Sequence, residues 1–303
     1  MRYPGVRIGE IFLNALKNED PEIEVEESVA SVSLPGALGK YPGVILTEDP
    51  LSLLLISAGT SCAISLSPTV GESALASSAA FLGKKLAFLS SYSISEGEIE
   101  LKVPETMFDS CLAYLSDPNF PTGRILSVEE AEALMKFFDF LLIDSTYSFM
   151  LRGNEGDLIR REHEALLNKS RDNLAFILRL HKTYGLKRYP AYLVISSSHR
   201  FLETLLMLVG WTRNGISSAY MKILSDPIVR ESVRKSAQML NEAASYLKES
   251  LRKLGWETVH SDMPYFLIKG SGTLPSSIRT MKLNEFVGIS REYMLAMPMD
   301  SSN

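Results

Sequence analysis

The chain has 303 residues, of which 46% are hydrophobic and 22% are charged, and its formal net charge is −5 at pH 7. This balance is ordinary for a soluble globular protein, and the length allows two domains or one large one. The acidic balance leaves no broad basic surface for nucleic acid, so small molecules or other protein chains are the expected partners.

Cysteine content and hydropathy restrict the class further. Cys62 and Cys111 lie far apart in the sequence, and we expect from them neither a disulfide framework nor a metal site. The first residues lack the apolar core of a signal peptide, and no apolar run reaches the roughly 20 residues that span a bilayer. We therefore expect a cytoplasmic protein without a membrane segment.

From residue 50 onward, short apolar runs alternate with stretches of helical periodicity. Before that point only an acidic stretch, Glu19–Glu27, stands out, as a solvated helix or loop. The expected strands are Leu53–Ser57, Leu86–Leu89, Ile99–Val103, Leu112–Leu115, Phe138–Ile143, Leu174–Leu178 and Tyr192–Ile195. The expected helices are Ser61–Leu82, Ser127–Phe137, which begins with a capping box, and Arg160–Lys169. Such alternation predicts an α/β fold with a mainly parallel sheet covered by helices on both faces.

The last third of the chain has a different pattern. It predicts two helices, His199–Leu208 and Pro227–Leu254, and short strands at Phe266–Lys269, Glu285–Ile289 and Tyr293–Met297. This pattern is typical of a smaller α+β domain. We expect three parts: an N-terminal segment 1–35 that packs with the small domain, a large domain 36–200, and a small C-terminal domain 201–303.

Three segments carry the candidate chemistry. The turn Ser116–Gly123, Ser-Asp-Pro-Asn-Phe-Pro-Thr-Gly, follows a buried strand and precedes the capped helix. Asp144 ends the next strand, and Tyr147 follows it by three residues. Lys182 follows the strand after that. Because ligands of open α/β sheets bind outside the carboxyl ends of the strands, an aspartate there could hold a pyridinium proton. Taken one at a time, each segment has an ordinary alternative: a proline-rich turn between a strand and a helix, an aspartate that caps a loop, and a lysine in a surface loop, which is much the commoner state of any one lysine.

In order and spelling, the three segments resemble the class I/II aminotransferases, which are fold-type I pyridoxal phosphate (PLP) enzymes. The turn resembles their Asn-Pro-x-Asn-Pro-Thr-Gly, Asp144 and Tyr147 their Asp-x-x-Tyr, and Lys182 the lysine of Ser-x-Ser-Lys-x-Tyr-Gly-Leu. The resemblance implies that Lys182 forms an imine with the cofactor aldehyde and that Asp144 and Tyr147 meet the ring nitrogen and the ring's 3-oxygen. It also implies a seven-stranded type of sheet and, most often, transamination of an amino acid or amino-phosphate substrate. The segment around Lys182 looks closest to the histidinol-phosphate aminotransferase and threonine-phosphate decarboxylase branch.

Weaker matches extend the resemblance to the rest of the cofactor site. Thr60 and Ser61, in Gly-Thr-Ser-Cys-Ala, resemble the loop that binds the cofactor phosphate at the start of a helix. Tyr92 stands at the place of the aromatic residue that stacks on the ring. Tyr41, in Lys-Tyr-Pro, resembles the tyrosine that reaches the phosphate of the other subunit, and the family implies a homodimer.

The sequence also departs from the family at positions that matter for function. Phe120 replaces the asparagine that binds the 3-oxygen, unless Asn119 takes that role. Arg179 stands where a hydroxyl residue binds the phosphate, and Arg179 or Arg188 could supply the missing phosphate charge. The arginine that clamps the substrate carboxylate is absent, because Gly288 or Leu295 stands at its position and Arg291 is the nearest substitute.

Two other functions remain open beside transamination. The departures favour a member that has lost catalysis and serves as a binding or regulatory subunit, whereas Asp144, Tyr147 and Lys182 speak against it. A PLP-dependent decarboxylase or lyase of the same family is a further alternative. An unrelated nucleotide-binding protein is disfavoured, because no phosphate-binding glycine motif follows a predicted strand.

Overall fold

The computed structural model describes residues 7–17, 42–66, 73–89, 91–153, 157–169, 172–209, 215–274, 278–282 and 292–298. The predicted acidic stretch Glu19–Glu27, Tyr41 and the predicted strand Glu285–Ile289 lie outside these ranges. Within them, no helix is both long enough and apolar enough to cross a membrane.

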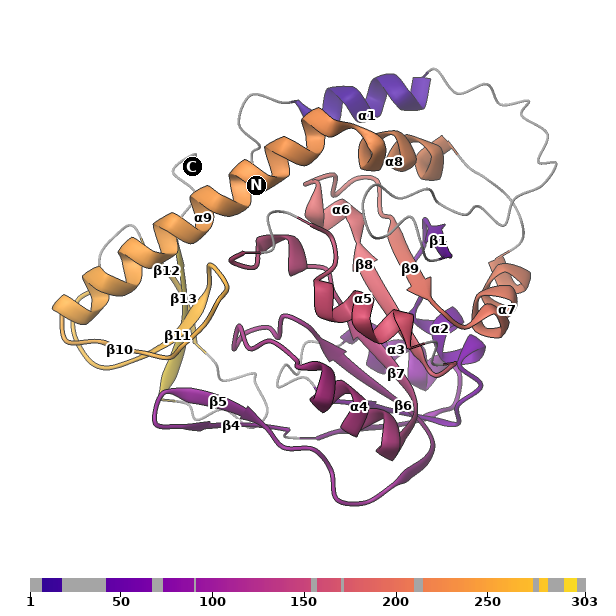
Figure 1. Cartoon of the computed structure of the whole chain (residues 1–303), viewed down its shortest axis with the longest axis horizontal. Helices are drawn as coiled ribbons and strands as arrows, with labels where there is room; N and C mark the ends of the chain where they lie inside the picture. The colour runs from indigo at the N-terminus through magenta and orange to yellow at the C-terminus, as the bar shows by residue number, and fades with distance from the viewer. Residues whose placement is uncertain are drawn as a thin grey trace.

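A seven-stranded sheet forms the centre of the molecule (Figure 1). In spatial order its strands are β1 (Gly43–Leu46), β9 (Tyr192–Ser196), β8 (Leu174–Arg179), β7 (Phe138–Asp144), β6 (Phe108–Ser116), β2 (Cys62–Ser65) and β3 (Lys85–Phe88). The five strands from β8 to β3 are mutually parallel. β9 runs antiparallel to both of its neighbours, β8 and β1. The predicted mainly parallel sheet is therefore confirmed.

Helices cover both faces of this sheet because its strands alternate apolar side chains between the two faces. On one face lie α1 (Ile8–Lys17), α4 (Val128–Phe137), α5 (Arg161–Asn168) and α8 (Gly215–Ser225). On the other face lie α2 (Leu51–Ser57), α3 (Ser73–Phe81) and α7 (His199–Val209). The sheet is therefore a central layer between two layers of helices.

A long helix, α9 (Pro227–Lys253), joins the large sheet to a smaller one (Figure 1). The small sheet is antiparallel, in the order β10 (Glu257–Thr258), β11 (Phe266–Lys269), β13 (Tyr293–Pro298) and β12 (Ile278–Lys282). A hairpin of β4 (Tyr92–Ser95) and β5 (Glu98–Leu101) packs beside it. The predicted α+β character of the last third is confirmed.

The capping box at the start of α4 is formed as predicted. The Ser127 hydroxyl accepts a hydrogen bond from the Glu130 backbone N–H at 3.1 Å, and the Glu130 carboxylate accepts from the Ser127 N–H at 3.0 Å. We expect Ser127→Ala to lower the free energy of unfolding by about 1 kcal/mol, because one N–H of the first turn loses its acceptor. Urea denaturation of Ser127→Ala and of Ser127→Thr, which keeps the hydroxyl, would measure this; equal stability of the two variants would contradict it.

Two predicted elements before residue 90 are wrong. Leu53–Ser57 belongs to helix α2 and is not a strand, and the predicted helix Ser61–Leu82 contains strand β2 before helix α3. In α2 the buried residues Leu51, Leu54 and Leu55 follow helical spacing. The Asp49 carboxylate also accepts a hydrogen bond from the Leu51 N–H at 3.1 Å, which starts the helix.

The expectation of no disulfide is also wrong. Cys62 on β2 and Cys111 on β6 are register partners in adjacent parallel strands, with their Cα atoms 4.6 Å apart, and the structure joins them in a disulfide. They are 49 positions apart in the sequence, and the chain between them contains a helix and a crossover connection that bring these distant positions together.

The packing of α1 and α7 concerns the predicted division into an N-terminal segment, a large domain and a small domain. α7, which begins at His199, packs through Phe201 and Leu205 on the large sheet. Phe12 of α1 packs on Tyr189 and Tyr220, with ring centroids 4.8 and 5.0 Å away. The boundaries at residues 35 and 200 stay predictions, and both helices join the cores of the large sheet.

Candidate functional site

The carboxyl ends of the parallel strands bring the candidate residues to one edge of the large sheet. β7 ends at Asp144, and β8 ends at Arg179, whose register partner on β9 is Tyr192. Side chains alternate along a strand, so Asp144 and Arg179 point to the same face as Leu142 and Ile177, the face that α2 and α7 cover. This edge and this face define the candidate site.

Asp144 is buried and its carboxylate is held by three neighbouring residues. Its Oδ1 accepts hydrogen bonds from the Thr146 backbone N–H, at 3.0 Å, and from the Thr146 hydroxyl. Its Oδ2 accepts from the Tyr114 hydroxyl at 2.8 Å and pairs with Arg179 Nη2 at 3.1 Å. The sequence did not indicate Tyr114 or Thr146; Tyr114 shares the face of Asp144 two residues before β6 ends.

Lys182 follows β8 directly, in the short helix α6 (Leu180–Thr183), and its side chain is exposed. Its neighbour His181 is half-buried. Its Nδ1 lies 3.1 Å from the Ala191 carbonyl oxygen and 3.3 Å from the Ala191 backbone nitrogen, and its ring contacts the Tyr192 ring edge-on at 5.2 Å. Burial lowers the pKa of His181, and the nearby cations Lys182 and Arg179 lower it further. A primary amine therefore stands beside an imidazole that favours its neutral form.

Tyr147 lies just beyond Asp144, at the start of the single turn η2 (Ser148–Met150). Its ring is partly buried and packs between the core of the large sheet and the cluster that joins the small sheet to the β4–β5 hairpin. Burial raises the pKa of Tyr265, and the nearby phenol of Tyr147 raises it further. Tyr147 thus lies where the two sheets meet, near the carboxyl end of β7.

The turn 116–123 has its polar side chains directed inward. Asn119 is 1% exposed, and its side-chain oxygen accepts a hydrogen bond from the Thr122 hydroxyl at 2.7 Å. Its amide nitrogen donates to Ser116 Oγ at 3.4 Å. Phe120 packs edge-on against Tyr265, with ring centroids 5.4 Å apart. Asn119 therefore serves the turn itself, and Phe120 is a packing residue between the two sheets.

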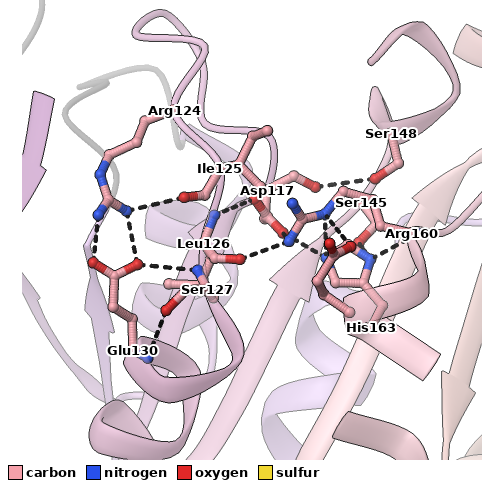
Figure 2. Close-up of polar contacts among 11 residues, drawn as sticks. Asp117, Arg124, Ile125, Leu126, Ser127, Glu130, Ser145, Ser148, Arg160 and His163 are labelled. Atoms are coloured by element: carbon pink, nitrogen blue, oxygen red, sulfur yellow. Dashed lines mark hydrogen bonds and ion pairs between the residues drawn. The ribbon is translucent and has the colours of Figure 1, made fainter. Parts of the chain in front are cut away.

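Beneath the turn, a buried ion cluster fixes its second residue, Asp117 (Figure 2). Asp117 Oδ2 pairs with Arg160 Nη2 at 2.9 Å and accepts a hydrogen bond from His163 Nε2. Asp117 Oδ1 accepts from the Leu126 backbone N–H at 2.8 Å, and Ser145 Oγ lies 3.3 Å from His163 Nδ1. Sequence reasoning missed this cluster; the usable signal was a histidine on the apolar side of α5 and an arginine directly before its first residue.

The protonation states in the cluster follow from its burial. Burial opposes charge on Asp117, but the hydrogen bond from His163 and the charge of Arg160 together lower the pKa of Asp117 below its usual value. Burial lowers the pKa of His163, and this outweighs the raising effect of Asp117. The cluster is therefore an Asp117–Arg160 ion pair with a neutral imidazole as hydrogen-bonding partner.

The segment predicted to bind phosphate lies at the opposite edge of the sheet. Thr60 and Ser61 follow helix α2 and precede strand β2, so the expected order of strand and then helix is reversed. The Ser61 N–H donates to the Ser110 carbonyl at 2.7 Å, near the amino end of β6. Because Asp144 lies at the carboxyl ends, Thr60 and Ser61 are separated from it by the length of the strands, and we withdraw them as phosphate ligands.

The remaining predicted residues are placed as follows. Tyr92 begins the β4–β5 hairpin, is 4% exposed, and packs in the cluster with Tyr265. Arg188 is exposed six residues after Lys182. Leu295 is fully buried on β13, between β11 and β12. Tyr41, Gly288 and Arg291 lie outside the described ranges.

Comparison with known proteins relates the chain to one family. The family model described as aminotransferase class I and II matches residues 104–286. A histidinol-phosphate aminotransferase of Thermotoga sp. (strain RQ2) is 23% identical over 164 residues, which are 54% of this chain and 45% of that protein. The chain thus spans about half the length of this curated relative.

Solved structures share the fold at low identity. The histidinol-phosphate aminotransferase of Clostridium acetobutylicum superposes with a TM-score of 0.68 at 14% identity, covering 99% of this chain and 93% of that chain. A PLP-bound C-S lyase of Staphylococcus hominis superposes with a TM-score of 0.69 at 16% identity, covering 95% and 80%. These likenesses bear out the predicted PLP-dependent transferase fold.

Proposed function

Because the chain belongs to the class I and II aminotransferase family, we propose that it is a PLP-dependent aminotransferase whose cofactor lysine is Lys182. One observation carries the proposal: Asp144 ends β7 and Lys182 follows β8, so both lie at the carboxyl ends of adjacent parallel strands. Ligands of open α/β sheets bind at this edge. The substrate that the family relatives suggest is an amino acid or an amino phosphate.

The residues at this edge fit pyridoxal phosphate, the cofactor that the family and its PLP-bound structural neighbour imply. Asp144 offers a carboxylate to the ring nitrogen, Lys182 an exposed amine to the aldehyde, and Tyr147 a phenol to the ring oxygen. Arg188 is the candidate cation for the phosphate. Phe120 does not fit, because its ring packs on Tyr265 and supplies no donor.

Each residue then has a definite task in the proposed reaction. Bound PLP supplies a ring that withdraws electrons from the substrate's amine-bearing carbon. Lys182 is the residue that would hold the cofactor through its amine Nζ, and the same amine, when not bound, could take and return a proton at the substrate's α-carbon. Tyr147 would offer its phenolic O–H to the cofactor's ring oxygen, and Asp144 would face the ring nitrogen.

Covalent attachment of PLP tests this proposal. We expect the purified protein mixed with PLP to turn yellow, and borohydride reduction followed by peptide mass spectrometry to locate the cofactor on Lys182. Lys182→Ala is expected to lose the attachment completely. Lys187→Ala, which removes an exposed lysine five residues away, is the matched control and should keep it. Attachment that survives in Lys182→Ala would refute the assignment.

Two alternative functions are each supported by a specific observation. The packing of Phe120 and the pairing of Asp144 with Arg179 favour a member that has lost catalysis and acts as a binding or regulatory subunit. The likeness to a C-S lyase favours decarboxylase or lyase chemistry on the same scaffold. An amine-donor screen with and without an added keto-acid acceptor separates these from transamination, because only transamination depends on the acceptor and transfers the amino group to it without releasing ammonia. The homodimer and the cytoplasmic location stay predictions.

A further inference from the structure

The carboxylate of Asp144 already has a cationic partner within its own chain. Arg179 Nη2 lies 3.1 Å from Asp144 Oδ2, and the two side chains are only 21% and 9% exposed. The same nitrogen donates to the Tyr114 hydroxyl at 3.2 Å, and that hydroxyl donates to Asp144 Oδ2 at 2.8 Å. Arginine, tyrosine and aspartate thus form a closed ring of contacts around one carboxylate oxygen.

The main chain of Arg179 supports the other carboxylate oxygen. The Arg179 backbone N–H donates to Thr146 Oγ1 at 3.0 Å, and the Thr146 hydroxyl donates to Asp144 Oδ1. Arg179 therefore supports Asp144 from both sides, once through its side chain and once through the end of β8. An ion pair held in this way, and mostly shielded from water, is much less screened than a surface pair.

This pairing changes what Asp144 can do for a bound cofactor ring. A carboxylate favours a protonated ring nitrogen because its negative charge stabilises the pyridinium. A guanidinium on the same carboxylate oxygen cancels that charge and repels a second cation nearby. The electrostatic support for a pyridinium proton is therefore largely removed.

We propose that Arg179 neutralises Asp144, so that the cofactor ring binds with its nitrogen unprotonated. The inference rests on the proposed function, because it needs PLP at this edge. Arg179 is here a positioning residue that acts through Asp144. An unprotonated ring withdraws electrons less strongly, so the site is suited to reactions that place less negative charge on the ring.

The protonation of the ring nitrogen can be read directly by nitrogen-15 NMR. PLP labelled at the ring nitrogen would be added to the full chain and its resonance compared with those of free PLP in acid and in alkali. We expect the wild-type resonance near the alkaline, unprotonated position. Arg179→Gln should move it to the acidic, protonated position, and Arg179→Lys, which keeps the charge, should restore the wild-type position.

Lys187→Gln removes a nearby exposed cation that does not pair with Asp144 and should leave the resonance unchanged. Circular dichroism would show that each variant is folded, and if Arg179→Gln is not, the wild-type resonance decides alone. A protonated resonance in the wild type would overturn the inference while the proposed function stands. No bound resonance in any variant would overturn the proposed function and the inference with it.

Discussion

Arg160→Met is expected to lower the free energy of unfolding by about 3–5 kcal/mol, because it leaves the buried carboxylate of Asp117 without its cation. Arg160 and Asp117 are 3% and 0% exposed, so water cannot take the place of the guanidinium. Arg160 Nη2 also donates to the Leu126 carbonyl at 2.6 Å, and that acceptor would lose its partner. Guanidinium denaturation followed by circular dichroism measures the effect.

The neighbouring arginine provides the control. Arg161 is the first residue of α5 and is exposed, so Arg161→Met should change stability by no more than about 0.5 kcal/mol. Equal losses in the two variants would show that Asp117 does not depend on Arg160. A large loss in Arg160→Met alone would show that the turn 116–123, and the candidate site above it, depend on this ion cluster.

Gly123→Ala should be the most damaging small substitution in the turn. Gly123 has φ +73°, and an added Cβ would clash with Ser261 Oγ and lie 2.9 Å from Ser261 Cβ. The left-handed conformation costs an alanine about 1–2 kcal/mol, and the overpacking adds about 1–3 kcal/mol. We therefore expect a loss of roughly 2–5 kcal/mol in the free energy of unfolding, measured in urea.

A second glycine separates these two contributions. Gly83 has φ +64°, and nothing lies within 4 Å of the position of its Cβ. Gly83→Ala should therefore show the conformational cost alone, about 1–2 kcal/mol. If Gly123→Ala lowers the free energy of unfolding by no more than Gly83→Ala does, the close contact between the turn and Ser261 does not contribute to the effect.

The parts of the fold that could be predicted are those in which local pattern and final structure agree. The runs Phe140–Ile143 and Leu174–Leu178, which directly precede Asp144 and Arg179, are apolar throughout, as is typical of strands buried on both faces, and each lies in a strand. The run Leu53–Ser57 is equally apolar but short, and periodicity alone does not distinguish a short buried strand from a buried helix. In the structure the segment is helical, and the Asp49 carboxylate accepts a hydrogen bond from the first backbone N–H of the helix. A hydrophobic pattern does not reveal such a hydrogen bond.

The error at Leu53–Ser57 led directly to the error at Thr60 and Ser61. Once a helix was taken for a strand, the following loop was assigned to the wrong edge of the sheet. The pairing of Cys62 with Cys111, like that of Asp144 with Arg179, depends on the register between strands. Register is set by the whole sheet, so contacts across it could not be derived from the order of residues along the chain.

The two ends of helix α9 pack in different cores, so a small rotation at one end displaces the other. Its Val229 and Val233 pack in the core of the large sheet, whereas Leu247 and Leu251 pack under the small one. At 27 residues it is about 40 Å long. A tilt of about 10° at its first turn would carry its far end through roughly 7 Å. The geometry between the two sheets therefore depends on how Asp226 caps the first turn of α9, far from the small sheet, as well as on the packing of Phe120 and Tyr147 at the junction.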